Sequence, residues 1–402
     1  MKYDFTTIID RKGKDALAVD LLPYSFGIGE NIKVRDGLDY IPMWIADMNF
    51  PTVPTVTEAI IRRAKHPTYG YFATSQEYYN KIIEWQERQN NVTGLEKEHI
   101  GYENGVLGGV ASALHTLCSQ GDPILVHAPT YIGFTKTLKN NGYNIVHSAL
   151  KKDDKDIWRM DFKDMEEKIV KNKIHCAIFC SPHNPTGRVW EKWEVEKVME
   201  LYAKHDVYVI SDEIWSDILL YGNKHIPTQS VSEDARNRTV AFYAPSKTFN
   251  LAGLIHSHVI IYDEKLMETY DAYIKSIGSP EVNLMGVTGM EAAYRGGEEW
   301  FENVKGLIRH NYEYMKGEFA KALPKIVVTP LEGTYLSWID LRGYMPGDKV
   351  ADFIQNKCRL ACDVGEWFSF TGHGFVRINL ATDTKNIKTA VERIIANMEE
   401  PS

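Results

Sequence analysis

The chain has 402 residues, of which 44% are hydrophobic and 25% are charged, as is ordinary for a globular protein. Its 46 basic and 54 acidic residues give a formal net charge of −8, which argues against broad nucleic-acid binding because that function needs a basic face. The length exceeds that of one typical domain and allows a large core without disulfides or metals. The composition excludes a disordered chain, a coiled coil and a small disulfide-linked scaffold.

No targeting or membrane segment is expected. The first residues, MKYDFTTIID, carry charge from position 2 onward and contain no apolar core, so we expect no signal peptide. No 18 apolar residues run together, so we expect no membrane-spanning helix and no membrane partner. The odd number of cysteines and the absence of zinc-finger spacing favour a cytoplasmic protein without a metal site. These cysteines are Cys118, Cys176, Cys180, Cys358 and Cys362.

The middle of the chain, over residues 50–290, alternates short apolar runs with longer amphipathic ones. Helical patterns cover residues 106–118 and 190–205. Short, wholly apolar strands separated by helices are typical of a parallel sheet covered on both faces. We therefore predict a large, doubly wound α/β domain here. The short runs, which are rich in β-forming residues, are at residues 124–128, 175–181, 207–212, 239–244 and 256–261.

The pattern changes after about residue 290. A long charged helix is predicted over residues 297–323, followed by strands and a closing helix over residues 383–398. The ends of a domain usually lie close together, so we expect residues 1–49 to pack against this segment. The second prediction is therefore a smaller α+β domain made of residues 1–49 and 291–402.

Polar residues directly follow several of the predicted strands. In open α/β sheets ligands bind at the carboxyl ends of the strands, so these residues should converge. Each alone has a plainer explanation, such as a surface lysine, a capping aspartate or an Asn-Pro-Thr-Gly turn. Together they offer what pyridoxal phosphate requires: an amine, a carboxylate for the ring nitrogen, an amide, an aromatic ring and a helix N-terminus for the phosphate. They are Lys247, Asp212, Asn184, Tyr131 and the segment Gly105-Val106-Leu107.

The motifs resemble those of the fold-type I, class I/II aminotransferase superfamily. Within it, the chain is similar to the MalY/PatB branch of cystathionine β-lyases, which are C–S lyases. NPTG, DE-I and SKTFNLAG carry the likeness to the superfamily, and the ADM-F opening and the TYLSW-DLR segment point to the lyase branch. The segments are MWIADMNFP (43–51), SPHNPTGRVW (181–190), SDEIWSDI (211–218), APSKTFNLAGL (244–254), EGTYLSWIDLR (332–342) and GHGFVRINL (372–380).

The resemblance implies a role for each matching residue. Lys247 would form the Schiff base with the cofactor and later move the substrate Cα proton. The other cofactor-binding residues would be Asp212 at the ring nitrogen, Asn184 at the phenolic oxygen, Tyr131 on the ring, and Gly105, Val106, Leu107 and Ser246 at the phosphate. Arg377 would grip the substrate carboxylate, helped by the backbone of Ile45 and Ala46 and by Asn184. Tyr71 would reach the phosphate of a second subunit, which implies a homodimer with a shared active site.

The sequence departs from the superfamily pattern at several positions. Trp215 stands where the superfamily commonly has Tyr and the lyase branch has His, so the second donor to the phenolic oxygen and the substrate range are open. Ile255 replaces a phosphate-binding Arg of many aminotransferases, and Ala244 replaces a Ser. Asn49 stands where the branch often has Asp. The absence of that Arg favours the lyase branch.

The expected reaction is α,β-elimination of a cysteine S-conjugate, such as L-cystathionine, to thiol, pyruvate and ammonia. Transamination of an L-amino acid with 2-oxoglutarate would use the same residues and stays open. A low-turnover protein that holds the cofactor for regulation is a third alternative. His256 and His258 alternate on one strand and could pair at a metal, but core histidines are the commoner explanation.

Overall fold

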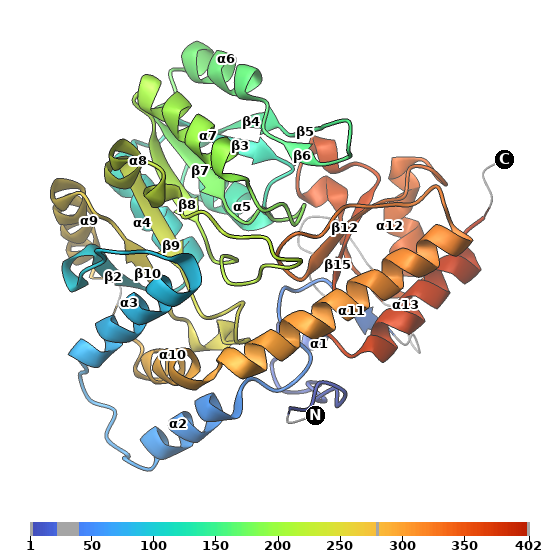
Figure 1. Cartoon of the computed structure of the whole chain (residues 1–402), viewed down its shortest axis with the longest axis horizontal. Helices are drawn as coiled ribbons and strands as arrows, with labels where there is room; N and C mark the ends of the chain where they lie inside the picture. Colours follow the sequence, from blue (N-terminus) through green and yellow to red (C-terminus); the bar gives the residue numbers. More distant parts are fainter. Residues whose placement is uncertain (1–2, 22–39, 279–280, 400–402) are drawn as a thin grey trace.

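The computed structural model describes residues 3–21, 40–278 and 281–399. A seven-stranded sheet, in the order β2-β10-β9-β8-β7-β3-β4, lies in the left half of the molecule as drawn in Figure 1. Only β10 runs antiparallel to its neighbours, so the predicted doubly wound, mostly parallel α/β class is confirmed. The strands are β2 (Ile100–Glu103), β3 (Pro123–Ala128), β4 (Asn144–Ala149), β7 (Cys176–Cys180), β8 (Tyr208–Asp212), β9 (Thr239–Tyr243) and β10 (Ser257–Ile260).

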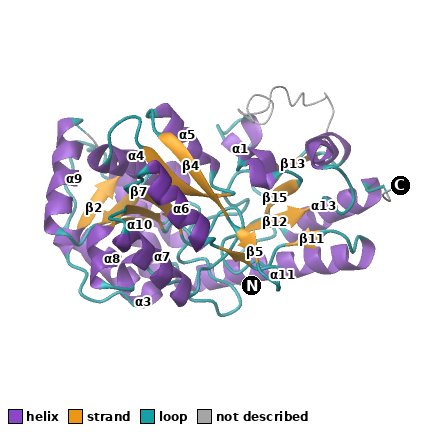
Figure 2. Cartoon of the chain, turned by 90° about the horizontal axis from the view of Figure 1, so that it is seen from above, coloured by secondary structure: helices purple, strands orange, loops and turns teal. Residues whose placement is uncertain are grey.

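Both faces of this sheet are buried beneath helices (Figure 2). Successive strand residues point to opposite faces, so Ile178 and Phe179 of β7 enter different hydrophobic clusters. Ile178 packs in the cluster that contains Val110 of α4, and Phe179 in the one that contains Val195 of α7. The helices of this region are α2 (Pro54–Ala64), α3 (Gln76–Asn90), α4 (Val106–Leu117), α5 (Ile132–Asn140), α6 (Phe162–Asn172), α7 (Lys192–Lys204), α8 (Glu233–Arg238), α9 (Glu264–Ser276) and α10 (Leu284–Gly296).

A four-stranded antiparallel sheet, in the order β11-β12-β15-β14, forms the centre of the C-terminal segment. Its strands are β11 (Val327–Val328), β12 (Leu336–Asp340), β14 (Asp363–Val364) and β15 (Phe375–Asn379). The long helix α11 (Glu298–Ala322) packs against the closing helix α13 (Thr384–Asn397), as Figure 1 shows. The two predicted helices exceed these bounds by one residue at each end. The domain boundaries at residues 49 and 290 stay a prediction.

The described N-terminal residues attach to this C-terminal segment. Strand β1 (Ile41–Pro42) pairs in parallel with β13 (Leu360–Ala361). The amide of Asn379 donates to the carbonyl of Met43 at 3.0 Å, and the amide of Asn49 donates to Ala381 at 3.1 Å. The remaining short elements are α1 (Leu17–Asp20), β5 (Lys151–Lys152), β6 (Trp158–Arg159) and α12 (Val350–Asp352). Within the three described ranges, no helix is both long and apolar enough to cross a membrane.

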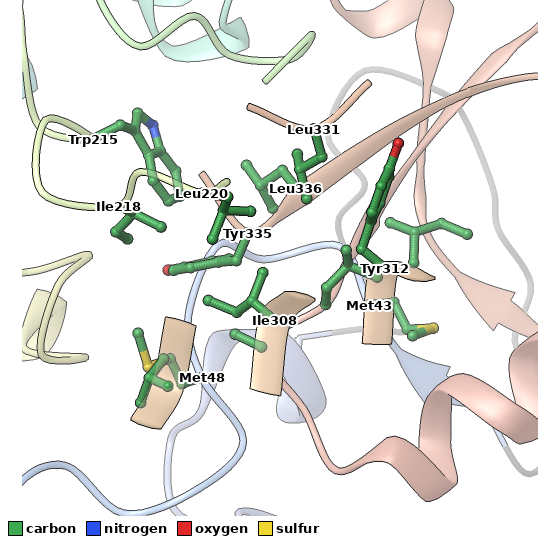
Figure 3. Close-up of a cluster of buried hydrophobic side chains, with 14 of the residues drawn as sticks. Met43, Met48, Trp215, Ile218, Leu220, Ile308, Tyr312, Leu331, Tyr335 and Leu336 are labelled. Atoms are coloured by element: carbon green, nitrogen blue, oxygen red, sulfur yellow. The ribbon is translucent and has the colours of Figure 1, made fainter. Parts of the chain in front are cut away.

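A buried hydrophobic cluster joins the two regions (Figure 3). It brings together Trp215 from the loop after β8, Tyr335 directly before β12, Ile308 of α11 and Met48 of the N-terminal segment. The rings of Trp215 and Tyr335 meet edge to face, with centroids 4.8 Å apart. Four segments that are distant in sequence therefore meet at the carboxyl end of β8, where the predicted site residues lie.

Candidate active site

The predicted residues converge on one cavity of about 320 Å³ at the carboxyl ends of the central strands. Asp212 is the last residue of β8, and Asn184, Tyr131 and Lys247 lie in the segments that follow β7, β3 and β9. The cavity has groups of every kind that the strand-end argument predicts. Its lining is Ala46, Asn104, Gly105, Val106, Leu107, Tyr131, Asn184, Asp212, Ile214, Trp215, Ser246, Lys247, Ala252, Ile255 and His256.

The Lys247 amine is held by backbone from the N-terminal segment. Its Nζ donates to the carbonyl of Ala46 at 2.9 Å, and the Tyr335 hydroxyl donates to the same oxygen at 2.8 Å. The Trp215 ring lies beside the amine, with its centroid 5.5 Å from Nζ. Burial, together with the positive charge of Arg377, lowers the pKa of Lys247 to about 8. The amine is therefore much easier to deprotonate than an ordinary lysine.

Asp212 is a buried carboxylate that faces the same cavity. Its Oδ1 accepts from the amide of Ile214 at 3.1 Å, and it forms no ion pair with any residue in the described ranges. Burial raises the pKa of Asp212 to about 7, although Lys247 and the Ile214 amide act in the opposite direction. A buried acid without a cationic partner is costly to ionise, so this position suits a ligand that brings a positive charge.

Asn184 is oriented by a buried guanidinium. Nη1 of Arg377 donates to Asn184 Oδ1 at 2.8 Å, so the NH2 group of the amide is left to donate elsewhere. Nη2 of Arg377 donates to the carbonyl of Trp44 at 3.0 Å and also pairs with Asp363. Asp363 and Arg377 lie opposite each other on β14 and β15. Burial raises the pKa of Asp363 to about 6, although the Arg377 charge lowers it. The pair fixes the guanidinium beside Asn184.

The N-terminus of α4 is suited to an anion. Its first residues line the cavity, and N–H groups in the first turn of a helix have no partner within the helix. Gly105 precedes the helix with φ of +86°, a backbone conformation that side-chain-bearing residues rarely adopt. Ser246 adds a hydroxyl to the same lining. This end of the cavity can hold a phosphate.

Tyr131 lines the cavity, and the position of its ring requires a glycine at residue 133. A Cβ on Gly133 would lie 2.4 Å from Cε1 of the Tyr131 ring. Only glycine at position 133 therefore lets this ring pack against the first turn of α5. The ring provides a flat surface against which an aromatic ligand can stack.

Three predicted residues do not line this cavity. Arg377 is buried behind Asn184 and acts on the cavity through it. Ile45 contributes a carbonyl that accepts from Asn379 Nδ2 at 2.7 Å, rather than a group facing the cavity. Tyr71 is fully exposed and lies in a separate groove with residues 281–285. Its predicted role therefore requires a second subunit.

Sequence reasoning did not identify all of the residues around the site. Asp363 went unnoticed because its contact with Arg377 arises from the pairing of β14 with β15, which has no local signal. Asn104 and Ile214 directly neighbour predicted residues, so the strand-end argument could have included them. His256 was interpreted as a core residue. It is buried, but it also lines the cavity, and its Nε2 lies 3.3 Å from the Tyr78 hydroxyl.

Comparison with known proteins agrees with this geometry. Residues 39–394 match the family of aminotransferases of class I and II. Cystathionine beta-lyase PatB of Bacillus subtilis is 32% identical over 92% of this chain and 94% of its own length. Protein MalY of Escherichia coli is 28% identical over 98% of each chain. The crystal structure of cystalysin from Treponema denticola, which contains a pyridoxal 5'-phosphate cofactor, has a TM-score of 0.91 at 30% identity and covers 99% of both chains.

The fold, the site and these matches define the class of protein. The chain belongs to the aminotransferase class I and II family. The resemblance to this family and to its MalY and PatB relatives, predicted from the motifs, is confirmed.

Proposed function

We propose that this protein is a pyridoxal-phosphate-dependent C–S β-lyase that cleaves cysteine S-conjugates to thiol, pyruvate and ammonia. The observation that carries the proposal is one cavity that joins a buried amine at Lys247, a buried carboxylate at Asp212 and the N-terminus of α4. These are the groups that the cofactor's aldehyde, ring nitrogen and phosphate require.

The donor set fits the cofactor in its charges as well as its shape. Asp212 has a raised pKa and lacks an ion-pair partner among the described residues, so a protonated ring nitrogen would relieve the cost of its burial. Lys247 has a lowered pKa, so its amine can act as a nucleophile near neutral pH. The N–H groups of Val106 and Leu107 and the Ser246 hydroxyl would hold the phosphate, and Tyr131 would stack on the ring.

Each residue of the cavity would then have its own role in the reaction. When bound, the cofactor supplies an electron sink for the substrate Cα. The Lys247 amine would remove the Cα proton, and the Asp212 carboxylate would favour a protonated ring nitrogen. Asn184 would hold the phenolic oxygen through its amide. Arg377, which acts on the cavity through Asn184, would orient the substrate carboxylate beside these groups, together with backbone from Ala46.

Support for the lyase reaction comes from the curated relatives. PatB is named a cystathionine beta-lyase, and the alignment covers nearly the whole length of both proteins. Transamination is the second candidate, because the family carries that name and the same residues would serve. The two reactions differ in whether a thiolate leaves from Cβ or a keto acid accepts the amino group.

A paired assay on purified, cofactor-saturated protein tests the proposal. One arm supplies L-cystathionine or S-alkyl cysteines and follows pyruvate and free thiol. The other supplies amino acids with 2-oxoglutarate and follows glutamate. Pyruvate and thiol formed without any keto acid support the lyase. Glutamate formed without thiol release would make the protein an aminotransferase, and no turnover or spectral change in either arm would favour the regulatory alternative.

We also propose a homodimer with a shared active site, located in the cytoplasm. The aromatic segment Tyr69–Phe72 is exposed on a single chain, and covering it with a second subunit would remove this apolar surface from water. The five cysteines are free, which suits a reducing compartment.

A further inference from the structure

The amino ends of β3 and β7 carry a group of metal-ligating side chains that the proposed reaction does not use. The ligand atoms of Cys118, Asp122 and His175 all lie within 4.8 Å of one another. The thiol of Cys176, the first residue of β7, lies beside that of Cys118 but is not one of these three mutually close ligand atoms. One sulfur, one imidazole nitrogen and one carboxylate oxygen thus meet at one place, with a second sulfur beside the first, although the four residues come from two separate segments.

We propose that Cys118, Asp122, His175 and Cys176 form a binding site for one Zn²⁺ ion. Zinc in structural sites takes four ligands in a tetrahedron, chosen from cysteine, histidine and carboxylate. Soft thiolates select zinc over magnesium or calcium. His175 Nε2 lies 3.4 Å from Asp122 Oδ2. Two such ligands on a tetrahedral ion would lie about 3.3 Å apart.

The backbone already holds these side chains in place. Cys118 caps α4, and its amide donates to Leu114 at 2.8 Å. The Asp122 carboxylate accepts from the amide of Ser119 at 2.7 Å, which fixes its orientation. Cys176 is paired with Ile124 in the sheet. Binding would therefore need little rearrangement, which favours affinity.

The site is open on one side. The side chains of His175 and Asp122 are 41% and 29% exposed, whereas Cys176 is buried. An ion can therefore reach the thiols from solvent past the histidine and the carboxylate. The prediction of no metal site uses only the spacing of cysteines along the sequence. Ligands that the sheet brings together from distant segments cannot be predicted from that spacing.

This site is separate from the candidate active site. Cys176 pairs with Tyr208 at the start of β8, whereas Cys180 pairs with Asp212 at its end. Four residues of strand separate the two positions, or about 13 Å. Because the ion would join the end of α4 to the start of β7, we assign it a structural role rather than one in catalysis.

Cobalt binding provides the test, because Co²⁺ replaces Zn²⁺ and reports tetrahedral thiolate ligation in its visible spectrum. Untagged, fully reduced holoenzyme is stripped with a chelator and titrated with Co²⁺, and Zn²⁺ is then added. We expect one Co²⁺ per chain, visible bands of a tetrahedral thiolate site, and their loss on adding Zn²⁺. Zinc should also raise the Tm of the wild-type protein.

Two variants and two controls locate the ion. Cys118→Ser and His175→Ala should each weaken Co²⁺ binding at least about tenfold, since even residues that only support metal ligands have effects of that size. Cys358→Ser and His310→Ala, which lie elsewhere in the chain, should bind as the wild type does. If Cys118→Ser fails to fold, His175→Ala decides, because its side chain is partly exposed. Absence of thiolate bands, or binding that His175→Ala leaves unchanged, would overturn the site.

Discussion

Two ionisable side chains in the candidate active site have pKa values moved toward neutrality from opposite sides. Burial raises the pKa of Asp212 to about 7 and lowers that of Lys247 to about 8. In the chain without cofactor, each group is therefore harder to charge than it would be in water, which opposes folding near neutral pH. A ligand that pairs with Asp212 and reacts with Lys247 would offset this cost. These two residues therefore favour ligand binding while they lower the stability of the cofactor-free protein.

The first prediction concerns Asp212→Asn in the cofactor-free protein. Because the folded state raises the carboxyl pKa from 3.8 to about 7, it binds this proton more tightly than the unfolded state, and wild-type stability falls as pH rises between those values. The variant lacks this dependence. It should be more stable than wild type at neutral pH by roughly 1–3 kcal/mol. The advantage should grow through that pH range and level off above it.

Thermal unfolding of both cofactor-free proteins across pH checks this. Asp340→Asn, which removes a carboxylate paired with Arg342, is the control and should show no such growth. An Asp212→Asn advantage that does not change with pH would refute the raised pKa. The variant should also bind pyridoxal phosphate more weakly.

The second prediction is that Lys247→Ala lowers kcat at least about 100-fold, because it removes the amine that transfers the Cα proton. The visible absorbance of the lysine-bound cofactor should disappear as well. Steady-state kinetics and the absorption spectrum are the measurements. Lys204→Ala, at an exposed lysine paired with Glu166, should behave as wild type. An unchanged spectrum in Lys247→Ala would remove this residue from its proposed role.

The third prediction concerns the buried pair of Asp363 with Arg377. Asp363→Asn should free the guanidinium from its fixed position, raise KM for amino-acid substrates about tenfold and leave kcat within a few-fold. It should also lower stability, since breaking a buried pair costs about 3–5 kcal/mol. Asp234→Asn, which breaks a partly exposed pair with Arg238, should cost less than about 1 kcal/mol and leave KM unchanged. A fall in kcat with constant KM would contradict the positioning role.

At the scale of elements, the sequence predicts the buried strands and the long helices well. All five β-rich runs become strands of the central sheet, because strands buried on both faces are rich in apolar and β-branched residues. Strands β2 and β4, at the two edges of the sheet, lie outside the five runs, and β4 carries polar and half-buried residues. The antiparallel direction of β10 could not be predicted either, because the composition of a buried strand does not depend on its direction in the sheet.

In the candidate site, too, some residues follow from a local sequence pattern and others do not. Lys247, Asp212, Asn184 and Tyr131 could be predicted because each lies at or just after the end of a strand, and parallel strands end at the same edge of the sheet. Asp363 could not be predicted, because its place beside Arg377 depends on the pairing of β14 with β15. Contacts fixed by the pairing of distant strands leave no pattern in the local sequence.

The fourth prediction belongs to the α4 element. Gly105→Ala should cost about 1–3 kcal/mol, because alanine is strained at a φ of +86°. It should also weaken pyridoxal-phosphate binding by distorting the first turn of α4. Gly94→Ala is the matched control: Gly94 has φ of +72°, with nothing within 4 Å of an added Cβ, and it does not line the cavity. Equal cofactor affinities in the two variants would exclude the helix start as the phosphate site.

At the scale of the whole molecule, a single chain exposes an aromatic segment. Tyr69 and Tyr71 are 58% and 106% exposed, and Tyr69–Phe72 line a groove with residues 281–285. Ile255, half exposed, lies at the margin of the active-site cavity. Apolar surface at these positions favours contact with another copy of the chain. If Tyr71 completes the partner's site, neither subunit is active alone.

The last prediction tests this sharing directly. Tyr71→Ala and Lys247→Ala homodimers should each be nearly inactive, and Tyr71→Ala should fold normally because the side chain is fully exposed. In a mixed dimer, one site carries both substitutions and the other carries neither. Co-expression of the two variants should therefore restore about one active site in four, since half of the dimers are mixed. Restored lyase activity in the co-expressed protein, absent from a mixture of the separately purified variants, is the expected result. No recovery, or a monomer by light scattering, would mean that each chain builds its site alone.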